Sequence, residues 1–239
     1  MDFLSSIMAC LVLLSLALFL PVAYGQQLVP ALFIFGDSVV DVGNNNNLRT
    51  LVKANFAPYG RDFVNHTATG RFSNGKIAID FIAKRLLFTS YQPPYLNKSN
   101  ATTRNLLIGA NFASAASGYY EETANIFLAI PLSKQLEHYK EYQEEVVELV
   151  GAENASLIFS RGVHILSTGN SDFVQNYYIN PVLNIALTSE QFSNVLVQKY
   201  AQFIEELYGL GARKIGVTTL PPIGCLPAVI TLFGFGQII

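Results

Sequence analysis

The chain has 239 residues, of which 51% are apolar and 13% are charged, with 15 lysine and arginine residues against 17 aspartate and glutamate residues. This near-neutral balance argues against a nucleic-acid-binding surface, which needs a basic excess. The three histidines and two cysteines lack the short spacings of zinc sites, so we expect no metal and no other cofactor in a single globular domain.

The N-terminal residues have the pattern of a secretory signal peptide, which we expect over residues 1–25. Their apolar stretch, residues 7–20, is shorter than the roughly 20 residues that a membrane span needs. Ala23-Tyr24-Gly25 then offers the small-x-small pattern of signal-peptidase cleavage. Asp2 stands where a basic residue is usual, which leaves a membrane anchor as the alternative. We therefore expect one domain over residues 26–239, without a transmembrane anchor.

The rest of the chain alternates short apolar runs with amphipathic stretches. Runs bounded by Gly, Asn or Pro predict four buried parallel strands, at 31–35, 106–112, 163–168 and 214–218. Apolar residues at helical spacing predict helices at 73–87, at 132–150, and from the capping-box pattern at 188–191 to Gly209. Strand and helix in alternation predict an α/β fold, with a parallel sheet covered on both faces.

The first predicted strand runs directly into Gly36-Asp37-Ser38 and a polar loop. Ligands of open α/β sheets bind beyond the carboxyl ends of the strands, so Ser38 is a candidate nucleophile. The same three residues are also ordinary turn and helix-capping chemistry, and taken alone they leave both interpretations open. We expect Asp37 and Asp41 to hold the loop together rather than to orient a catalytic histidine.

The longer segment 33–47, FIFGDSVVDVGNNNN, closely resembles the first block of the plant GDSL esterase/lipase family, within the SGNH hydrolases. Two further segments, NFASAASG at 111–118 and PPIGCLP at 221–227, resemble later parts of the family pattern. The resemblance covers the chain from about Leu28 to its last residues. It implies a three-layer α/β/α, flavodoxin-like sheet and a serine hydrolase that acts on carboxylic esters, including lipids.

The resemblance also assigns roles to individual residues. It makes Ser38 the nucleophile, with its backbone N–H and that of Gly118 as oxyanion donors. The family usually shows Gly-x-Asn-Asp in its third block, whereas this chain has Gly169-Asn170-Ser171-Asp172. Successive side chains at a strand end point to opposite sides, so register favours Ser171 as the third donor. An adjusted loop would favour Asn170 instead, and we keep both; Asp172 is expected to hold its own loop.

The family's Asp-x-x-His, which supplies the base and its orienting acid, does not occur in this sequence. None of His66, His138 and His164 is expected to replace that base. We therefore expect a C-terminally incomplete member that lacks the last elements of the fold and has impaired catalysis. The resemblance also pairs Cys225 with a downstream cysteine that this sequence does not contain. The alternative is an inactive short product, which binds acyl groups or glycans or is degenerate.

Four sequons support secretion, at Asn65, Asn97, Asn100 and Asn154. Asn97 and Asn100 are close enough to hinder each other, so we expect at most three to be fully occupied. The expected location is extracellular, in the apoplast or cell wall. The expected partner is a small ester or lipid substrate and not a nucleic acid, while the oligomeric state is not predicted.

Overall fold

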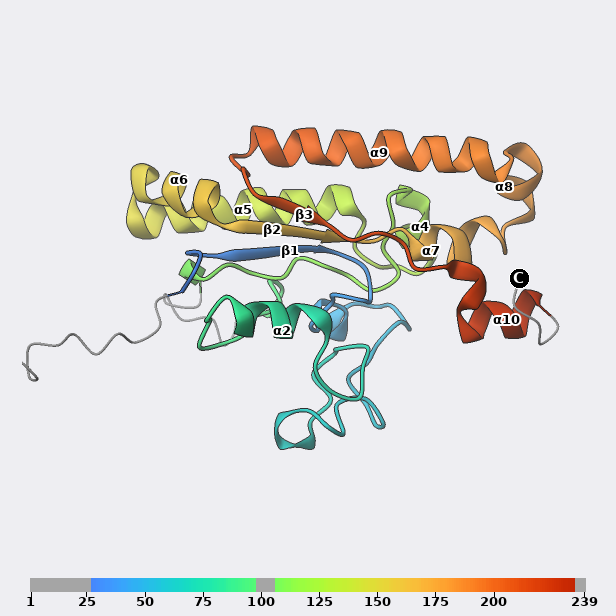
Figure 1. Cartoon of the computed structure of the whole chain (residues 1–239), viewed down its shortest axis with the longest axis horizontal. Helices are drawn as coiled ribbons and strands as arrows, with labels where there is room; N and C mark the ends of the chain where they lie inside the picture. Colours follow the sequence, from blue (N-terminus) through green and yellow to red (C-terminus); the bar gives the residue numbers. More distant parts are fainter. Residues whose placement is uncertain (1–26, 98–105, 235–239) are drawn as a thin grey trace, which may run out of the picture.

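The computed structural model describes residues 27–97 and 106–234 and has an α/β architecture (Figure 1). The expected signal peptide and the Asn100 sequon lie outside these residues. In the described part, three parallel strands form one sheet in the order β1 (Leu32–Gly36), β2 (Val163–Ser167) and β3 (Ile215–Val217). Phe33 is the register partner of His164, which in turn faces Ile215. Parallel pairing requires long crossovers, and helices supply them.

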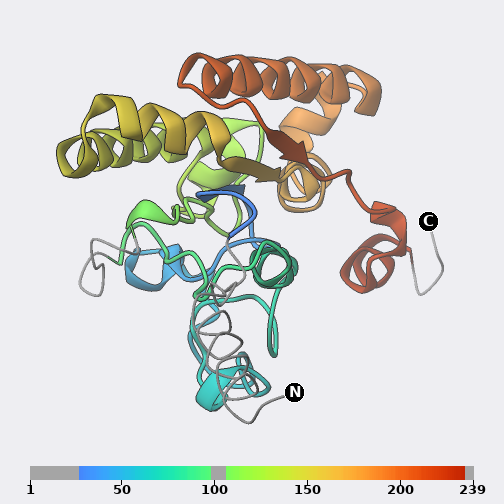
Figure 2. The ribbon, with the colours of Figure 1, turned by 60° about the vertical axis from the view of Figure 1, so that its left-hand side comes forward.

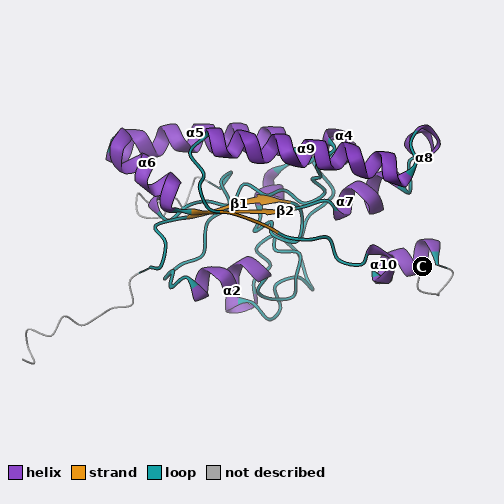
Figure 3. Cartoon of the chain, turned by 45° about the horizontal axis from the view of Figure 1, so that its top comes forward, coloured by secondary structure: helices purple, strands orange, loops and turns teal. Residues whose placement is uncertain are grey.

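Helices cover both faces of this sheet, as the α/β prediction requires. In chain order the helical elements are η1 (Asn44–Asn47), η2 (Val64–His66), α2 (Ala78–Arg85), α4 (Glu121–Ile126), α5 (Leu132–Val150), α6 (Ala152–Arg161), α7 (Asn170–Asp172), the π-helical η4 (Phe173–Tyr177), α8 (Pro181–Ala186), α9 (Ser189–Gly209), η5 (Ile223–Cys225) and α10 (Pro227–Phe233). Helices α5, α6 and α9 lie on one side and α2 on the other (Figures 1 and 3). Figure 2 shows α10 to one side of the main helical layer. The three-layer prediction is confirmed.

The first strand explains why both faces need covering. Phe33 and Phe35 point into a core with α5, α6 and α9, whereas Leu32 and Ile34 point into a second core with α2. All four side chains are fully buried. An apolar run without polar alternation is therefore typical of a parallel strand buried on both faces.

The strand predicted at 106–112 is wrong. Gly109 has a φ of +99°, and a Cβ there would lie 2.1 Å from the carbonyl oxygen of Leu32. The chain still runs alongside β1, because the Leu32 N–H donates to Ile108 O at 3.0 Å and the Ile34 N–H to Ala110 O at 3.1 Å. Regular pairing is reduced to single bridges at Asn111. The apolar run indicated burial correctly, but the conformation of the glycine interrupts the strand.

The helix predictions succeeded best where the capping signals were strongest. Helix α5 has the predicted bounds, and α9 begins at the predicted capping box, with the Gln191 N–H donating to Thr188 Oγ1 at 3.2 Å. The helix predicted at 73–87 is shorter, since α2 begins only at Ala78. Its start is set by Asp80, whose Oδ2 accepts the Ile77 N–H at 3.0 Å.

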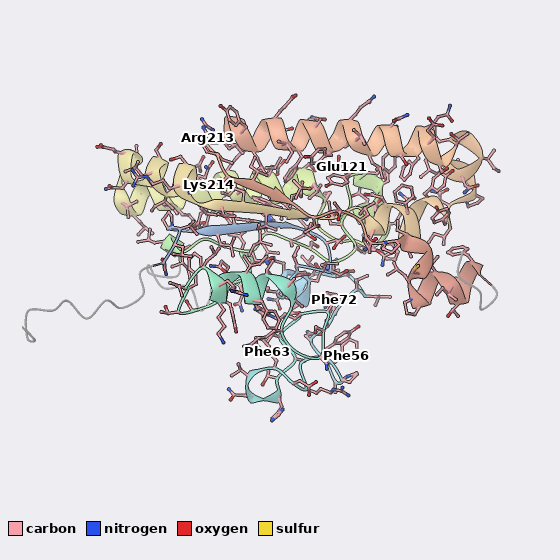
Figure 4. The ribbon with its side chains drawn as sticks, viewed as in Figure 1. Phe56, Phe63, Phe72, Glu121, Arg213 and Lys214 are labelled. Atoms are coloured by element: carbon pink, nitrogen blue, oxygen red, sulfur yellow. The ribbon has the colours of Figure 1, made fainter. Side chains whose placement is uncertain are left out.

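Residues 49–76 form a lobe of loops beyond α2, away from the sheet, where Figure 4 labels Phe56, Phe63 and Phe72. A buried ion pair ties this lobe to α2: Arg71 Nε and a terminal guanidinium nitrogen each lie 2.9 Å from a carboxylate oxygen of Asp80. The same guanidinium lies 4.6 Å from the centre of the Phe63 ring. The Arg71 guanidinium therefore holds the lobe in place by its charge, by two parallel hydrogen bonds and by stacking on an aromatic ring.

Removing the charge of Asp80 tests this tie. We expect Asp80→Asn to lower the free energy of unfolding by about 3–5 kcal/mol, because it leaves the buried Arg71 charge without its counter-ion. The matched control is Asp62→Asn, since the Arg61–Asp62 pair is 67% and 58% exposed; it should cost less than about 1 kcal/mol. Urea unfolding of both variants measures this, and equal losses would contradict the buried-pair argument.

Candidate active site

The carboxyl ends of the three strands meet at one edge of the sheet, and a cavity of about 390 Å³ opens there. Its lining comes from the residues that follow each strand: Asp37, Val39, Ser167, Thr168, Asn170, Thr218, Thr219, Leu220 and Pro221. Ser38 is half-buried and lies in the chain between two of these lining residues. The candidate nucleophile therefore follows the carboxyl end of β1, beside this cavity but not among its lining residues.

The turn that carries Ser38 is held tightly against β2. Gly36 has a φ of +138°, and a Cβ there would lie 1.9 Å from the carbonyl oxygen of Ser167, so only glycine fits. The Asp37 N–H donates to the same carbonyl at 3.0 Å. Asp37 Oδ1 then accepts the Val39 N–H at 3.0 Å and closes the turn. The turn-forming role predicted for Asp37 is confirmed.

Asp41 holds the following loop, also as predicted. Its fully buried carboxylate accepts the N–H groups of Gly43 at 2.7 Å and Asn44 at 2.9 Å. The other oxygen accepts the Ala115 N–H at 3.0 Å. The side chain of Asn44 adds donations to the carbonyls of Asn111 and Ala113, at 2.9 and 2.8 Å. The asparagine-rich loop thus fastens the first block to the second.

Asp172 plays a different structural role from the one predicted. Instead of holding its own loop, it accepts the N–H groups of Tyr119 at 2.8 Å and Tyr120 at 3.1 Å and the hydroxyl of Thr123 at 2.7 Å. These bonds satisfy donors at the start of α4, where negative charge is also favourable. A Cβ on Gly118 would lie 2.1 Å from Asp172 Oδ1. The requirement for glycine at 118 therefore comes from this carboxylate.

Neither candidate backbone donor lines the strand-end cavity: Ser38 lies beside it, and Gly118 lines a separate cavity of about 120 Å³ against α5 and α9. Within the described chain, the N–H groups of Ser38 and Gly118 donate to no protein acceptor. Thr168, which lines the cavity, donates its hydroxyl to Ser117 O at 3.3 Å. This bond ties the residue before Gly118 to the end of β2.

The two candidates for the third oxyanion donor occupy different positions. Asn170 is half-buried and lines the cavity. Ser171 is 5% exposed and is not among the lining residues of that cavity. The helical turn α7 begins at Asn170, directly after Gly169 with its φ of +119°. The chain therefore leaves strand geometry before Asn170, and strand alternation no longer decides which side chain faces the cavity.

Burial raises the pKa of the carboxyl groups around the nucleophile turn. The pKa of Asp37 rises to about 7, mainly by burial and further by the nearby charge of Asp172. Burial likewise raises the pKa values of Asp41 and Asp172 to about 6, against the opposing effect of their N–H and hydroxyl donors. Asp37 is the one of the three that lines the cavity, so its protonation changes near neutral pH beside Ser38.

The three histidines lie apart from this cavity. His164 is fully buried on β2 with Nε2 2.8 Å from the Tyr139 hydroxyl, and burial lowers its pKa to about 3. His66 lies on the exposed lobe, and His138 packs 5.2 Å from the Tyr95 ring. None of them lines the cavity. In residues 27–97 and 106–234, no three His, Cys, Asp or Glu side chains are grouped to hold a metal ion.

The sequence reasoning missed two polar residues of the site, Thr168 and Gln135. Gln135 is fully buried and reaches the end of β1 from α5. The signal was present in the sequence: Gln135 falls on the stripe of α5 that also buries Leu132, Leu136 and Tyr139. A polar side chain on the apolar stripe of an amphipathic helix indicates a buried hydrogen-bonding role.

Comparison with known proteins gives consistent matches. A family model described as GDSL-like lipase/acylhydrolase matches residues 32–237. GDSL esterase/lipase At5g03820 of Arabidopsis thaliana is 63% identical over 213 residues, which cover 89% of this chain and 60% of the relative. GDSL esterase/lipase APG of the same plant is 52% identical over 237 residues, which cover 99% of this chain and 67% of the relative. The chain thus spans about 60 to 67% of the length of these relatives.

The raised pKa of Asp37 predicts a pH effect on stability. Between about pH 4 and pH 7 the folded state holds the Asp37 proton more tightly than the unfolded state, so this group makes the free energy of unfolding fall as pH rises. Asp37→Asn keeps an acceptor for the Val39 N–H but removes the titration. We expect the variant to gain stability relative to the parent chain from pH 4 to pH 8, in urea unfolding.

The exposed Asp62→Asn variant is the control for this pH series. It removes a carboxylate that is 58% exposed, and the stability curve of Asp37→Asn is compared with it. Parallel stability curves for Asp37→Asn and the parent chain would rule out a buried, proton-holding Asp37.

Proposed function

Because the chain belongs to the GDSL-like lipase/acylhydrolase family, we propose that it is a secreted serine hydrolase of carboxylic esters in which Ser38 is the nucleophile. The observation that carries the proposal is the position of Ser38, on a turn tied to β2 and flanked by two lining residues of the strand-end cavity. The names of its relatives, GDSL esterase/lipases, support the class of reaction.

The proposed reaction is acyl transfer through a covalent intermediate. Ser38 Oγ attacks the ester carbonyl carbon and loses its proton to a base, and the carbonyl oxygen becomes an oxyanion. The free N–H groups of Ser38 and Gly118 are the donors proposed to stabilise that charge, with the side-chain amide of Asn170 as the third. Collapse of the intermediate expels the alcohol, and attack by water on the acyl-serine then releases the acid.

We assign only the nucleophile and the oxyanion donors to these 239 residues. The sequence contains no Asp-x-x-His, and no histidine of the described chain lines the cavity. Without a base, binding and oxyanion stabilisation leave only residual catalysis, several orders of magnitude below an intact triad. The proposal for this chain is therefore an activatable serine with impaired turnover.

An apolar cavity next to the strand ends supports an acyl group as part of the substrate. It measures about 600 Å³ and shares Leu220 and Pro221 with the smaller cavity. Its lining is mostly aromatic and aliphatic: Tyr119, Phe173, Tyr178, Leu196, Val197, Tyr200, Val217 and Ile223, with Gly169, Ser189 and Ser193. Tyr120 and Tyr177 pack against Phe192 instead. An apolar lining of this kind suits the acyl chain of a lipid or of another long-chain ester.

Secretion and glycosylation remain part of the proposal. Asn65, Asn97 and Asn154 are exposed, as attachment of a glycan requires.

Cys225 is exposed and unpaired within the described residues. No helix of the described chain combines the length and the apolar character of a bilayer span. We place the protein outside the cell, with a small ester or lipid as its partner.

Covalent labelling tests the proposed nucleophile. A fluorophosphonate probe forms a bond between phosphorus and serine Oγ and releases fluoride, and without a protein base the hydroxyl proton passes to solvent, so that the reaction is slow. We expect slow, stoichiometric labelling of the full chain, with the adduct on Ser38 by peptide mass spectrometry, and none in Ser38→Ala. A folded chain that stays unlabelled would contradict the proposal and favour the alternative, an inactive protein with an acyl- or glycan-binding cleft.

A pair of substitutions separates the candidates for the third donor. Asn170→Ala should slow labelling of Ser38 by about a hundredfold, since loss of one oxyanion donor typically has an effect of that size. Ser171→Ala, one residue away, is the matched control and should label at nearly the parent rate. The reverse order would assign the donor to Ser171, as strand register predicted from the sequence.

A further inference from the structure

Gln135 is a fully buried amide in the first turns of α5, at the boundary between the helical layer and the sheet edge. A buried amide is costly unless its polar atoms find partners. Here Oε1 accepts the Gly36 N–H at 2.9 Å, while Nε2 donates to Gly36 O at 3.0 Å and Ser117 Oγ at 3.1 Å, with Ile130 O at 3.2 Å. Both the acceptor and the donor capacity of the side chain are used.

The partners of Gln135 flank the two candidate oxyanion donors. Gly36 lies two residues before Ser38, and Ser117 lies one residue before Gly118. The Gln135 amide bonds the N–H and the C=O of Gly36, as a neighbouring strand would. Its Nε2, which donates to Gly36 O, also donates to Ser117 Oγ. One planar group therefore sets the separation between two segments that are about 80 residues apart in sequence.

Other contacts between these segments act farther from Gly118. The Ser114 N–H donates to Gly36 O at 3.0 Å, and Asp41 accepts the Ala115 N–H. These bonds fix the start of the loop, three to four residues before Gly118. Among the described residues, the Gln135 side chain bonds both Gly36 and Ser117, while the Thr168 hydroxyl reaches Ser117 at its carbonyl oxygen.

We propose that Gln135 is a positioning residue for ester hydrolysis, whose amide holds the N–H groups of Ser38 and Gly118 in register for one oxyanion. This inference rests on the proposed function for the role of those donors. Oxyanion donors act over a narrow range of distance, and displacements of about 1 Å are costly. Gln135 itself lines neither strand-end cavity, so it acts through Gly36 and Ser117.

Gln135→Met tests this role, because methionine has similar length and fills the space without pairing with Gly36. The matched control is Gln143→Met on the same helix, where Nε2 donates to Leu210 O at 2.8 Å, away from the strand ends. Three quantities are compared in the full chain: melting temperature, hydrogen–deuterium exchange of peptides that cover residues 34–40 and 114–120, and the rate of fluorophosphonate labelling at Ser38.

We expect Gln135→Met to increase exchange in both peptides and to slow labelling at least about tenfold. Gln143→Met should leave both readings at parent values, even where its melting temperature falls equally. If Gln135→Met does not fold, Gln135→Asn replaces it. This variant keeps the amide but is one methylene shorter, so it cannot bond Gly36 and Ser117 together, and it should show the same changes to a smaller extent.

Parent-like exchange and labelling in the Gln135 variants would overturn the inference. So would equal changes in the Gln143 control, because they would reveal a general loss of stability. The proposed function fails separately, through a folded parent chain that is not labelled at all. In that case the exchange comparison still decides whether Gln135 orders the two segments.

Discussion

The contact on which the site depends is the approach of the Gly36 backbone to the carbonyl of Ser167. Any side chain at position 36 would overlap that carbonyl, as the 1.9 Å separation of a built Cβ shows. The approach lets the Asp37 N–H bond the same carbonyl and turns the chain sharply at the end of β1. Ser38 is thereby delivered to the edge of the sheet, where its backbone N–H has no hydrogen-bond acceptor among residues 27–97 and 106–234.

Next to β1, buried polar side chains rather than regular strand pairing hold the loops in place. Beside β1, Gly109 interrupts the extended segment, so the ladder alone does not fix the loop that carries Gly118. Asp41 and Asn44 hold this loop against the first block, residues 33–47. Asp172, in the third block, holds the chain just after Gly118. Each of these groups is fully or almost fully buried and satisfied by several hydrogen bonds, which makes the network rigid.

The fold and the turn that carries Ser38 could be predicted from the sequence because their signals are local. An apolar run that ends in Gly36-Asp37-Ser38 defines the strand and its turn, and capping residues define α5 and α9. The strand at 106–112 was mispredicted because apolar character reports burial, whereas the positive φ of Gly109 follows from a tertiary contact with Leu32. The choice between Asn170 and Ser171 stayed open for a similar reason, since α7 begins at Asn170 and ends the strand alternation on which register depends.

The same reasoning explains which part of the chemistry these residues hold. Two of the three proposed oxyanion donors are backbone groups, so their geometry is set by turns, glycine contacts and buried amides of the described chain. A base, by contrast, is a side chain whose function needs both position and an accessible proton. His164 has neither, because it is sealed between Phe33 and Tyr139 with its pKa lowered by burial, at the opposite end of β2 from the cavity. The positions of the proposed backbone donors are therefore set by contacts that involve no histidine, so the donors and the base can be studied separately.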